Sequence, residues 1–120
     1  MEKKIYFHDT DCGGVVYYSN YLKYLEEART EFIEKKGIKV QDFLHAVRKC
    51  NITYKSPARY GDVLNVETKI KEITAAQIIF EQAIYHKSDK RLIVEAETSL
   101  VSLNKDFKPS PIPDEIKIKL

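Results

Sequence analysis

The chain has 120 residues, a formal net charge of +2 and two cysteines. Its length predicts one domain over residues 1–120, because a single hydrophobic core usually organises roughly 100 to 200 residues. A charge so close to neutral argues against a nucleic-acid-binding protein, and no apolar run approaches the roughly 18 residues that a membrane span needs.

Neither cysteine stands in a pattern typical of a metal site or a redox pair. Cys12 and Cys50 are far apart in the sequence and show no Cys-x-x-Cys or Cys/His ligand spacing. The first residues, MEKKIYFHD, lack the apolar core of a signal peptide. We therefore expect a cytoplasmic protein with reduced thiols and no metal ligands.

The first predicted element is a short strand at residues 4–8, which are rich in aromatic and β-branched side chains. This strand enters a turn at Gly13 and Gly14, where the backbone can adopt positive φ and a ligand can approach closely. Ser19 and Asn20 follow, and their side chains offer acceptors for the free amides of a helix start.

A long amphipathic helix is predicted over residues 20–36, ending before Gly37. Apolar residues recur at helical spacing along one side, and polar residues occupy the other. The apolar positions are Tyr21, Leu22, Leu25, Ala28, Phe32 and Ile33. At 1.5 Å per residue this helix spans about 25 Å, which matches a sheet of roughly five strands spaced about 4.8 Å apart.

After the helix, the pattern changes to the two-residue period of β-strands. Strands are predicted at residues 45–55, 62–73, 77–86 and 91–103. The links between the last three are short, which predicts hairpins and therefore an antiparallel sheet. Prolines end the last strand, and residues 114–120 form either a short helix or a frayed end. One helix and one sheet with a single apolar face predict an α+β fold.

The segment between the first strand and the helix combines a carboxylate with a bare helix start. Asp9 and Asp11 flank Thr10 just before the glycine turn. A carboxylate followed within about ten residues by a helix N-terminus puts a base or nucleophile near donors for an oxyanion. Acyl-transfer chemistry needs both groups.

Four segments resemble the signature of the 4-hydroxybenzoyl-CoA thioesterase family: DTDCGGVVYYSNY at 9–21, EEARTE at 26–31, YKSPARYGD at 54–62 and PIPDEI at 111–116. They are most similar to the acyl-CoA thioesterase branch associated with the Tol-Pal system. The resemblance covers essentially the whole chain. It implies a hot-dog fold, in which an antiparallel sheet wraps around one long helix. It also implies a homodimer or homotetramer that hydrolyses acyl-CoA thioesters without a metal or other cofactor.

The resemblance assigns catalysis to Asp11, the second Asp of a D-x-D motif, as nucleophile or general base. It assigns polarisation of the thioester carbonyl to the backbone amide at Tyr18. The Tol-Pal branch usually has His at this position and the hydroxybenzoyl enzymes can have Tyr, so the acyl preference stays open. The residues expected to contact the substrate are Gly13, Gly14, Val15, Val16, Tyr17 and Arg59.

The cations that hold the coenzyme A phosphates are not evident from the resemblance. Some relatives have a basic pair after the second long strand, where this chain has Thr74-Ala75. The contacts must therefore come from elsewhere, and the candidates are Arg59, Lys55 and the pair Lys90-Arg91.

Other readings of the same residues compete with this one. Cys12 beside Asp11 suggests a thiol nucleophile, but that chemistry needs a positioned His, and His8 stands across the expected strand end. A dehydratase of the same fold would need a His with an acidic partner in its own motif, which we do not find. A non-catalytic acyl-CoA-binding or interaction module also stays open, because a carboxylate can be present and unproductive.

Overall fold

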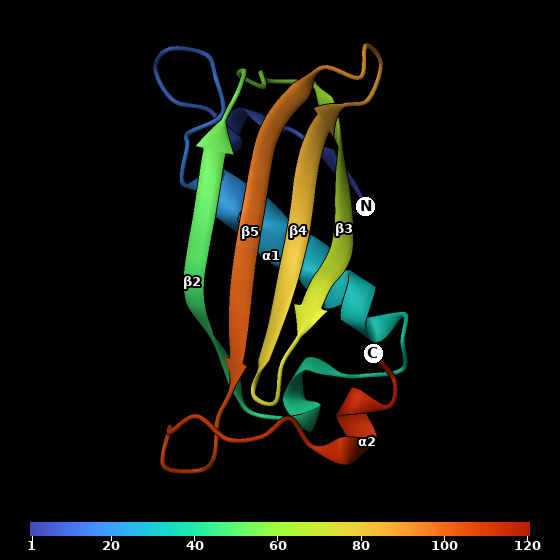
Figure 1. Ribbon diagram of the computed structural model, residues 1–120. Coiled ribbons are helices and arrows are strands. Elements are labelled where there is room, and N and C mark those ends of the chain that lie inside the picture. Colours follow the sequence, from blue (N-terminus) through green and yellow to red (C-terminus); the bar gives the residue numbers. More distant parts are fainter.

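Alternating strand residues form a five-stranded antiparallel sheet in the computed structural model, which describes residues 1–120 (Figure 1). The sheet has the strand order β1-β3-β4-β5-β2, so β1 and β2 are its edges. The strands are β1 (Glu2–Lys4), β2 (His45–Tyr54), β3 (Val63–Ile73), β4 (Gln77–His86) and β5 (Leu92–Ser102). The predicted hairpins are confirmed, because β3 pairs with β4 and β4 with β5 in antiparallel register.

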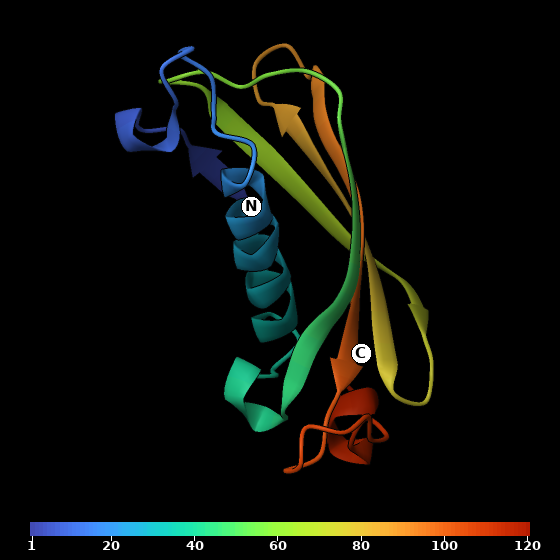
Figure 2. The same ribbon diagram turned by 90° about the vertical axis from the view of Figure 1, so that its left-hand side faces the viewer.

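One long helix, α1 (Asn20–Glu34), packs against one face of this sheet. It crosses behind the strands in Figure 1 and stands as a separate layer in Figure 2. The helix ends two residues earlier than the periodicity suggests, and the following turn contains Gly37 at φ 80°. A short helix, α2 (Asp114–Lys117), follows β5 at the lower end of the molecule in Figure 1. Neither α1 nor α2 is long and apolar enough to cross a lipid bilayer.

The buried face of α1 is shifted slightly from the predicted one. Leu22 was expected on the apolar side but is exposed, whereas Tyr24 and Arg29 are buried. The buried arc therefore follows Tyr21, Leu25 and Ala28, with Leu22 on its flank.

The core lies between α1 and the sheet in two clusters. The first lies under the start of the helix and includes Leu25, Ile84 and Val94. The second, under its end, includes Ile33 and Phe80. No helix covers the opposite face of the sheet, which faces the viewer in Figure 1. This uncovered face carries ion pairs between Lys71 and Glu97 and between Lys69 and Glu81.

The strand predicted at residues 4–8 is wrong. The strand is Glu2–Lys4, and Phe7–Asp9 form a 3₁₀ turn. The reason is the Asp9 carboxylate, which accepts a hydrogen bond from the Tyr6 amide at 2.9 Å, while the Asp9 amide donates to the Tyr6 carbonyl at 3.0 Å. This closure bends the aromatic segment out of the sheet.

Candidate functional site

Residues 9–17 form a small hairpin directly before α1. The Asp11 amide donates to the Val15 carbonyl at 2.9 Å, and the Tyr17 amide donates to the Asp9 carbonyl at 3.0 Å. Between them the chain reverses at Gly14, whose φ of 77° favours glycine. The hairpin therefore carries Asp11 near its tip and leads straight into the helix start. We call residues 9–17 the Asp11 hairpin.

Asp11 is exposed, and one of its carboxylate oxygens is held by the backbone. Oδ1 accepts a hydrogen bond from the Gly13 amide at 2.8 Å. A Cβ at position 13 would lie 3.1 Å from the same oxygen, so glycine permits this close approach. The other oxygen, Oδ2, accepts no hydrogen bond within the chain. Asp11 is thus oriented on one side and available on the other.

The predicted side-chain capping of α1 is wrong. Ser19 has helical backbone angles, φ −70° and ψ −19°, and makes no cap hydrogen bond. Asn20 instead uses Nδ2 to donate to the Asp9 carbonyl at 2.9 Å. As a result, the amides of Tyr18 and Ser19 donate no hydrogen bond within the chain. They lie at the positive end of the helix dipole, where an oxyanion is stabilised.

Residues 55–62 contact the Asp11 hairpin and the start of α1 through hydrogen bonds. The Val16 amide donates to the Ala58 carbonyl at 2.8 Å, and the Ala58 amide donates to the Tyr21 hydroxyl at 3.1 Å. Val15 pairs with Arg59 in an isolated bridge. Val16 itself is buried in the core. With only 4% of its surface exposed, Val16 serves to anchor the hairpin in the core.

Tyrosines gather at the start of α1. The Tyr18 ring lies 5.0 Å from the Tyr17 ring and 6.1 Å from the Tyr54 ring, measured between centroids. Tyr17 and Tyr18 are 47% and 61% exposed. The Tyr54 hydroxyl donates to the Tyr18 carbonyl at 3.4 Å. Burial raises the pKa of both Tyr21 and Tyr54, so both hydroxyls stay protonated at neutral pH.

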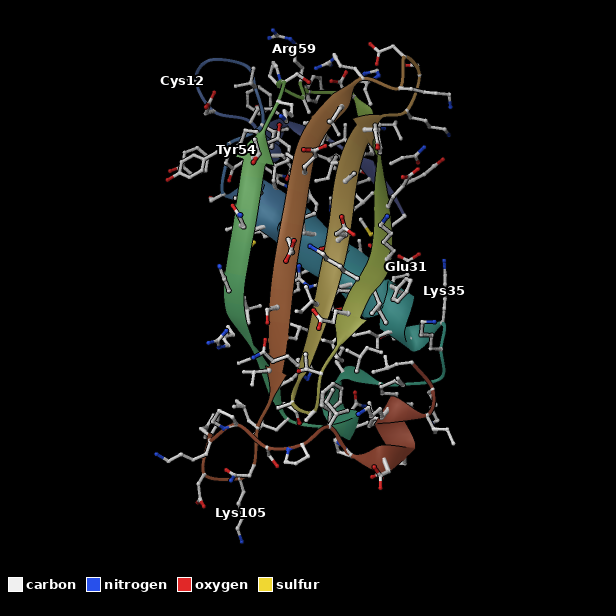
Figure 3. The ribbon with its side chains drawn as sticks, viewed as in Figure 1. Cys12, Glu31, Lys35, Tyr54, Arg59 and Lys105 are labelled. Carbon is white, nitrogen blue, oxygen red and sulfur yellow. The ribbon has the colours of Figure 1, made fainter.

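Tyr54 was not expected at this site, whereas Tyr21 stood among the tyrosines that could be core, subunit contact or acyl-pocket wall. Tyr54 reaches Tyr18 from β2, across 36 residues of chain. It stands at the start of the YKSPARYGD segment, which was the only signal in the sequence. In Figure 3, Tyr54, Cys12 and Arg59 lie toward the same end of the molecule.

No hydrogen bond joins Cys12 to a histidine, which the alternative thiol nucleophile would need as its base. His8 turns its Nε2 toward the Asp9 Oδ1 at 3.8 Å, and Cys12 is exposed and free. No group of three or more His, Cys, Asp or Glu side chains is arranged to hold a metal ion.

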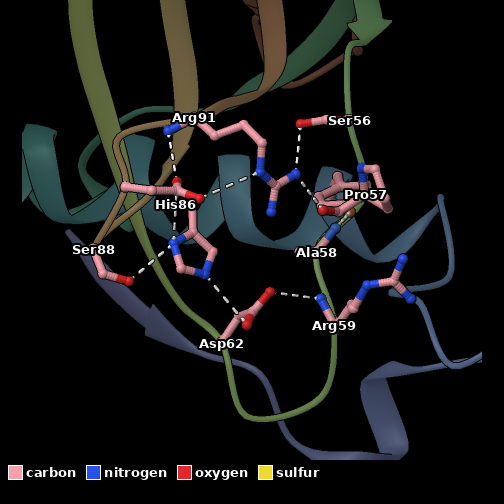
Figure 4. Close-up of polar contacts among 10 residues, drawn as sticks. Ser56, Pro57, Ala58, Arg59, Asp62, His86, Ser88 and Arg91 are labelled. Carbon is pink, nitrogen blue, oxygen red and sulfur yellow. Dashed lines mark hydrogen bonds and ion pairs between the residues drawn. The ribbon is translucent and has the colours of Figure 1, made fainter.

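The candidate cations differ in their partners. The Arg59 side chain is exposed and takes part in no ion pair or hydrogen bond. Only the Arg59 backbone is bonded: its amide donates to the Asp62 carboxylate at 2.8 Å, and its carbonyl accepts from the Asp62 amide at 3.0 Å. The Arg91 guanidinium instead donates to Ser56 and Pro57 (Figure 4). Arg59 is thus the free guanidinium on this side of the site.

The model of the Thioesterase-like superfamily matches residues 5–120. The chain belongs to this superfamily. Among curated relatives, the acyl-CoA thioester hydrolase YbgC of Escherichia coli O6:H1 is 32% identical over 119 residues, which cover 94% of this chain and 88% of the relative.

Solved structures of thioesterases are similar to this chain in fold. The 1,4-dihydroxy-2-naphthoyl-CoA thioesterase of Synechocystis superposes with a TM-score of 0.92 at 25% identity, covering 99% of this chain and 92% of the other. The 4-hydroxybenzoyl-CoA thioesterase of a Pseudomonas strain shares the fold, with a TM-score of 0.91 at 23% identity over 100% and 96% of the two chains. The predicted hot-dog fold, the family and the class of enzyme, a thioester hydrolase, are confirmed.

Proposed function

We propose that the protein hydrolyses acyl-CoA thioesters, with Asp11 as nucleophile or general base. The observation that carries this proposal is that the Asp11 Oδ2 accepts no hydrogen bond. The Asp11 hairpin leads directly to the start of α1, where the amides of Tyr18 and Ser19 are also unpaired. The curated relative from Escherichia coli is named as an acyl-CoA thioester hydrolase, which supports the same substrate class.

The chemistry needs an anionic group and a donor for the carbonyl oxygen. In one route Asp11 attacks the carbonyl carbon and releases the coenzyme A thiolate, and water then hydrolyses the resulting anhydride to the free acid and the Asp11 carboxylate. In the other route Asp11 takes a proton from water as the water attacks, and the coenzyme A thiolate leaves with that proton as the thiol. In both routes negative charge grows on the carbonyl oxygen, and the Tyr18 amide and the helix dipole stabilise it. Arg59 supplies a guanidinium for a coenzyme A phosphate.

The first experiment is an assay of thiol release from a panel of acyl-CoAs. Steady release of coenzyme A supports hydrolysis. An enoyl product without thiol would support a dehydratase instead, and tight binding without turnover would support a binding module.

We also propose that residues 1–120 act as one domain in the cytoplasm, where Cys12 and Cys50 stay reduced. Both cysteines are free and exposed. An oxidising compartment would expose these thiols to unwanted pairing.

We propose that the active unit contains at least two copies, as a homodimer or a homotetramer. β2 pairs only with β5, so the other edge of its 10 residues offers unpaired backbone groups to a second chain. Apolar side chains on and beside β2 are exposed: Val47 lies on this strand, and Tyr18 lies against Tyr54 at its end. A second β2 pairing there would place two Asp11 hairpins along one seam.

Val47→Glu is expected to weaken this pairing. Val47 is 53% exposed in the single chain. A carboxylate without a partner at a buried seam costs about 3 kcal/mol, so the dissociation constant should rise by about 10²-fold. The measurement is light scattering together with turnover at the same concentrations. Ile118→Glu, on an exposed side chain near α2, is the matched control. A fully active wild-type monomer would contradict the proposal.

Short or small aromatic acyl-CoAs are expected to be better substrates than palmitoyl-CoA. Tyr17, Tyr18 and Tyr54 supply the bulky surface at the helix start. If they close the acyl end, each methylene that fits gains about 0.8 kcal/mol and each that does not fit clashes. The measurement is kcat/KM for a series from acetyl- to palmitoyl-CoA plus benzoyl-CoA.

Tyr18→Ala should shift this preference toward longer chains, while Phe107→Ala, at an exposed ring in the turn after β5, serves as control. A wild-type kcat/KM that rises steadily to palmitoyl-CoA would reject the closed pocket. An unchanged preference in Tyr18→Ala would remove Tyr18 as its wall.

A further inference from the structure

The Asp11 hairpin depends on residues 55–62 for its position. Val16 in the hairpin donates to the Ala58 carbonyl, and Tyr21 in α1 accepts from the Ala58 amide. Ala58 is fully buried, and its two hydrogen bonds hold the hairpin and the start of the helix relative to each other. A shift of Ala58 would therefore strain the hydrogen bonds that hold the Asp11 hairpin and the start of α1.

Arg91, at the turn between β4 and β5, holds the start of this segment. Its guanidinium donates to the Ser56 Oγ at 2.8 Å and to the Pro57 carbonyl at 2.7 Å, as Figure 4 shows. Ser56 Oγ in turn donates to the Leu92 carbonyl at 2.6 Å. The guanidinium therefore links the carbonyl next to Ala58 to the sheet.

The other end of the segment is held by the same turn. Asp62 faces His86, with 3.3 Å between its Oδ1 and the His86 Nε2, and its Oδ2 accepts from the Arg59 amide at 2.8 Å. Asp89 faces the other imidazole nitrogen at 3.3 Å and the Arg91 Nε at 3.7 Å. The Arg91 amide, then His86 and the Arg91 guanidinium, lower the pKa of Asp89. The β4–β5 turn therefore holds both ends of residues 57–62, through Arg91 at Pro57 and through His86 at Asp62 (Figure 4).

We propose that Arg91 is a positioning residue for the thioesterase site, acting through residues 55–62 and not through substrate. This inference rests on the proposed function. The Arg91 guanidinium already has acceptors at Ser56 and Pro57 and a carboxylate at Asp89. It is therefore committed to the protein, whereas the Arg59 guanidinium has no partner and is free for a phosphate.

Arg91→Met tests this directly. Loss of the two hydrogen bonds lets Ala58 shift, and small misplacements of reacting groups cost up to about 10²-fold in rate. We expect kcat to fall by at least about 10-fold with KM changed by less than about 2-fold, because ground-state binding is not altered. In Arg91→Ala, whose short side chain leaves the site open, guanidinium ion at low millimolar concentration should restore part of kcat. Lys105→Met, at the exposed turn far from the site, should match wild type.

Arg59→Met provides the contrast, because a phosphate contact should raise KM. A rise in KM with normal kcat in Arg91→Met would mean that Arg91 binds substrate, and this would overturn the proposal. Unchanged kinetics in Arg91→Met would overturn it equally.

A second readout does not depend on turnover. Hydrogen exchange at the Val16 amide reports whether its bond to Ala58 opens. We expect exchange there to be at least about 10-fold faster in Arg91→Met, with Asp89→Asn showing a smaller change in the same direction. Unchanged exchange at Val16 in both folded variants would reject the inference. If the wild type released no thiol from any acyl-CoA, the proposed function would fail while this exchange test still decided the role of Arg91.

Discussion

Asp11→Asn is expected to lower kcat by at least about 10²-fold, the low end of the effect of removing a general base. The amide cannot attack a thioester or take a proton from water at neutral pH, so either proposed role is lost. The Asn Oδ1 can still accept the hydrogen bond that the Gly13 amide now donates to Asp11 at 2.8 Å. The hairpin should therefore keep its shape, and KM should change little.

The measurement is steady-state hydrolysis of the best acyl-CoA, with circular dichroism to establish folding. Asp106→Asn, in the exposed turn after β5, removes the same charge far from the site and should leave kcat unchanged. A folded Asp11→Asn protein that turns over at the wild-type rate would rule out Asp11 in either role.

Phe80→Ala is expected to destabilise the fold by about 3–5 kcal/mol, the usual cost of deleting a buried phenyl ring. Phe80 is fully buried under the end of α1 and packs edge-on against Phe32, with 6.1 Å between ring centroids. The cavity would open in the cluster farther from the Asp11 hairpin. Urea unfolding measures the loss as a lower midpoint with an unchanged slope.

Phe107→Ala is the matched control, because this ring is 71% exposed. It should change the free energy of unfolding by no more than about 0.5 kcal/mol. Equal losses in the two variants would show that the core assignment is wrong.

Much of the fold could be predicted because its pattern is local. In β3, Leu64 and Val66 alternate with Asn65 and Glu67, and only one of these two faces meets α1. The first strand was misplaced for a physical reason: an aromatic segment has strand propensity, but one carboxylate, Asp9, closes a turn across it. The spacing of apolar residues does not show when a single side-chain hydrogen bond will favour a turn over a strand.

The candidate site was partly predictable. Asp11 and the helix start are neighbours in sequence, so a motif can carry them together. The contacts that hold them are distant: Ala58 bonds to Tyr21 across 37 residues, and Arg91 bonds to Pro57 across 34. No local pattern encodes which residues meet across such separations. The capping of α1 also failed as a prediction, because Asn20 turns back to bond Asp9.

The end of the chain offers a practical advantage for handling the enzyme. The C-terminus lies beside α2, toward the opposite end of the molecule from the Asp11 hairpin, which Cys12 marks in Figure 3 (Figures 1 and 3). A linker that tethers the protein to a bead or sensor chip through Leu120 would leave the Asp11 hairpin pointing into solution. Surface-based binding measurements with immobilised protein should then sample the same accessible site as free enzyme.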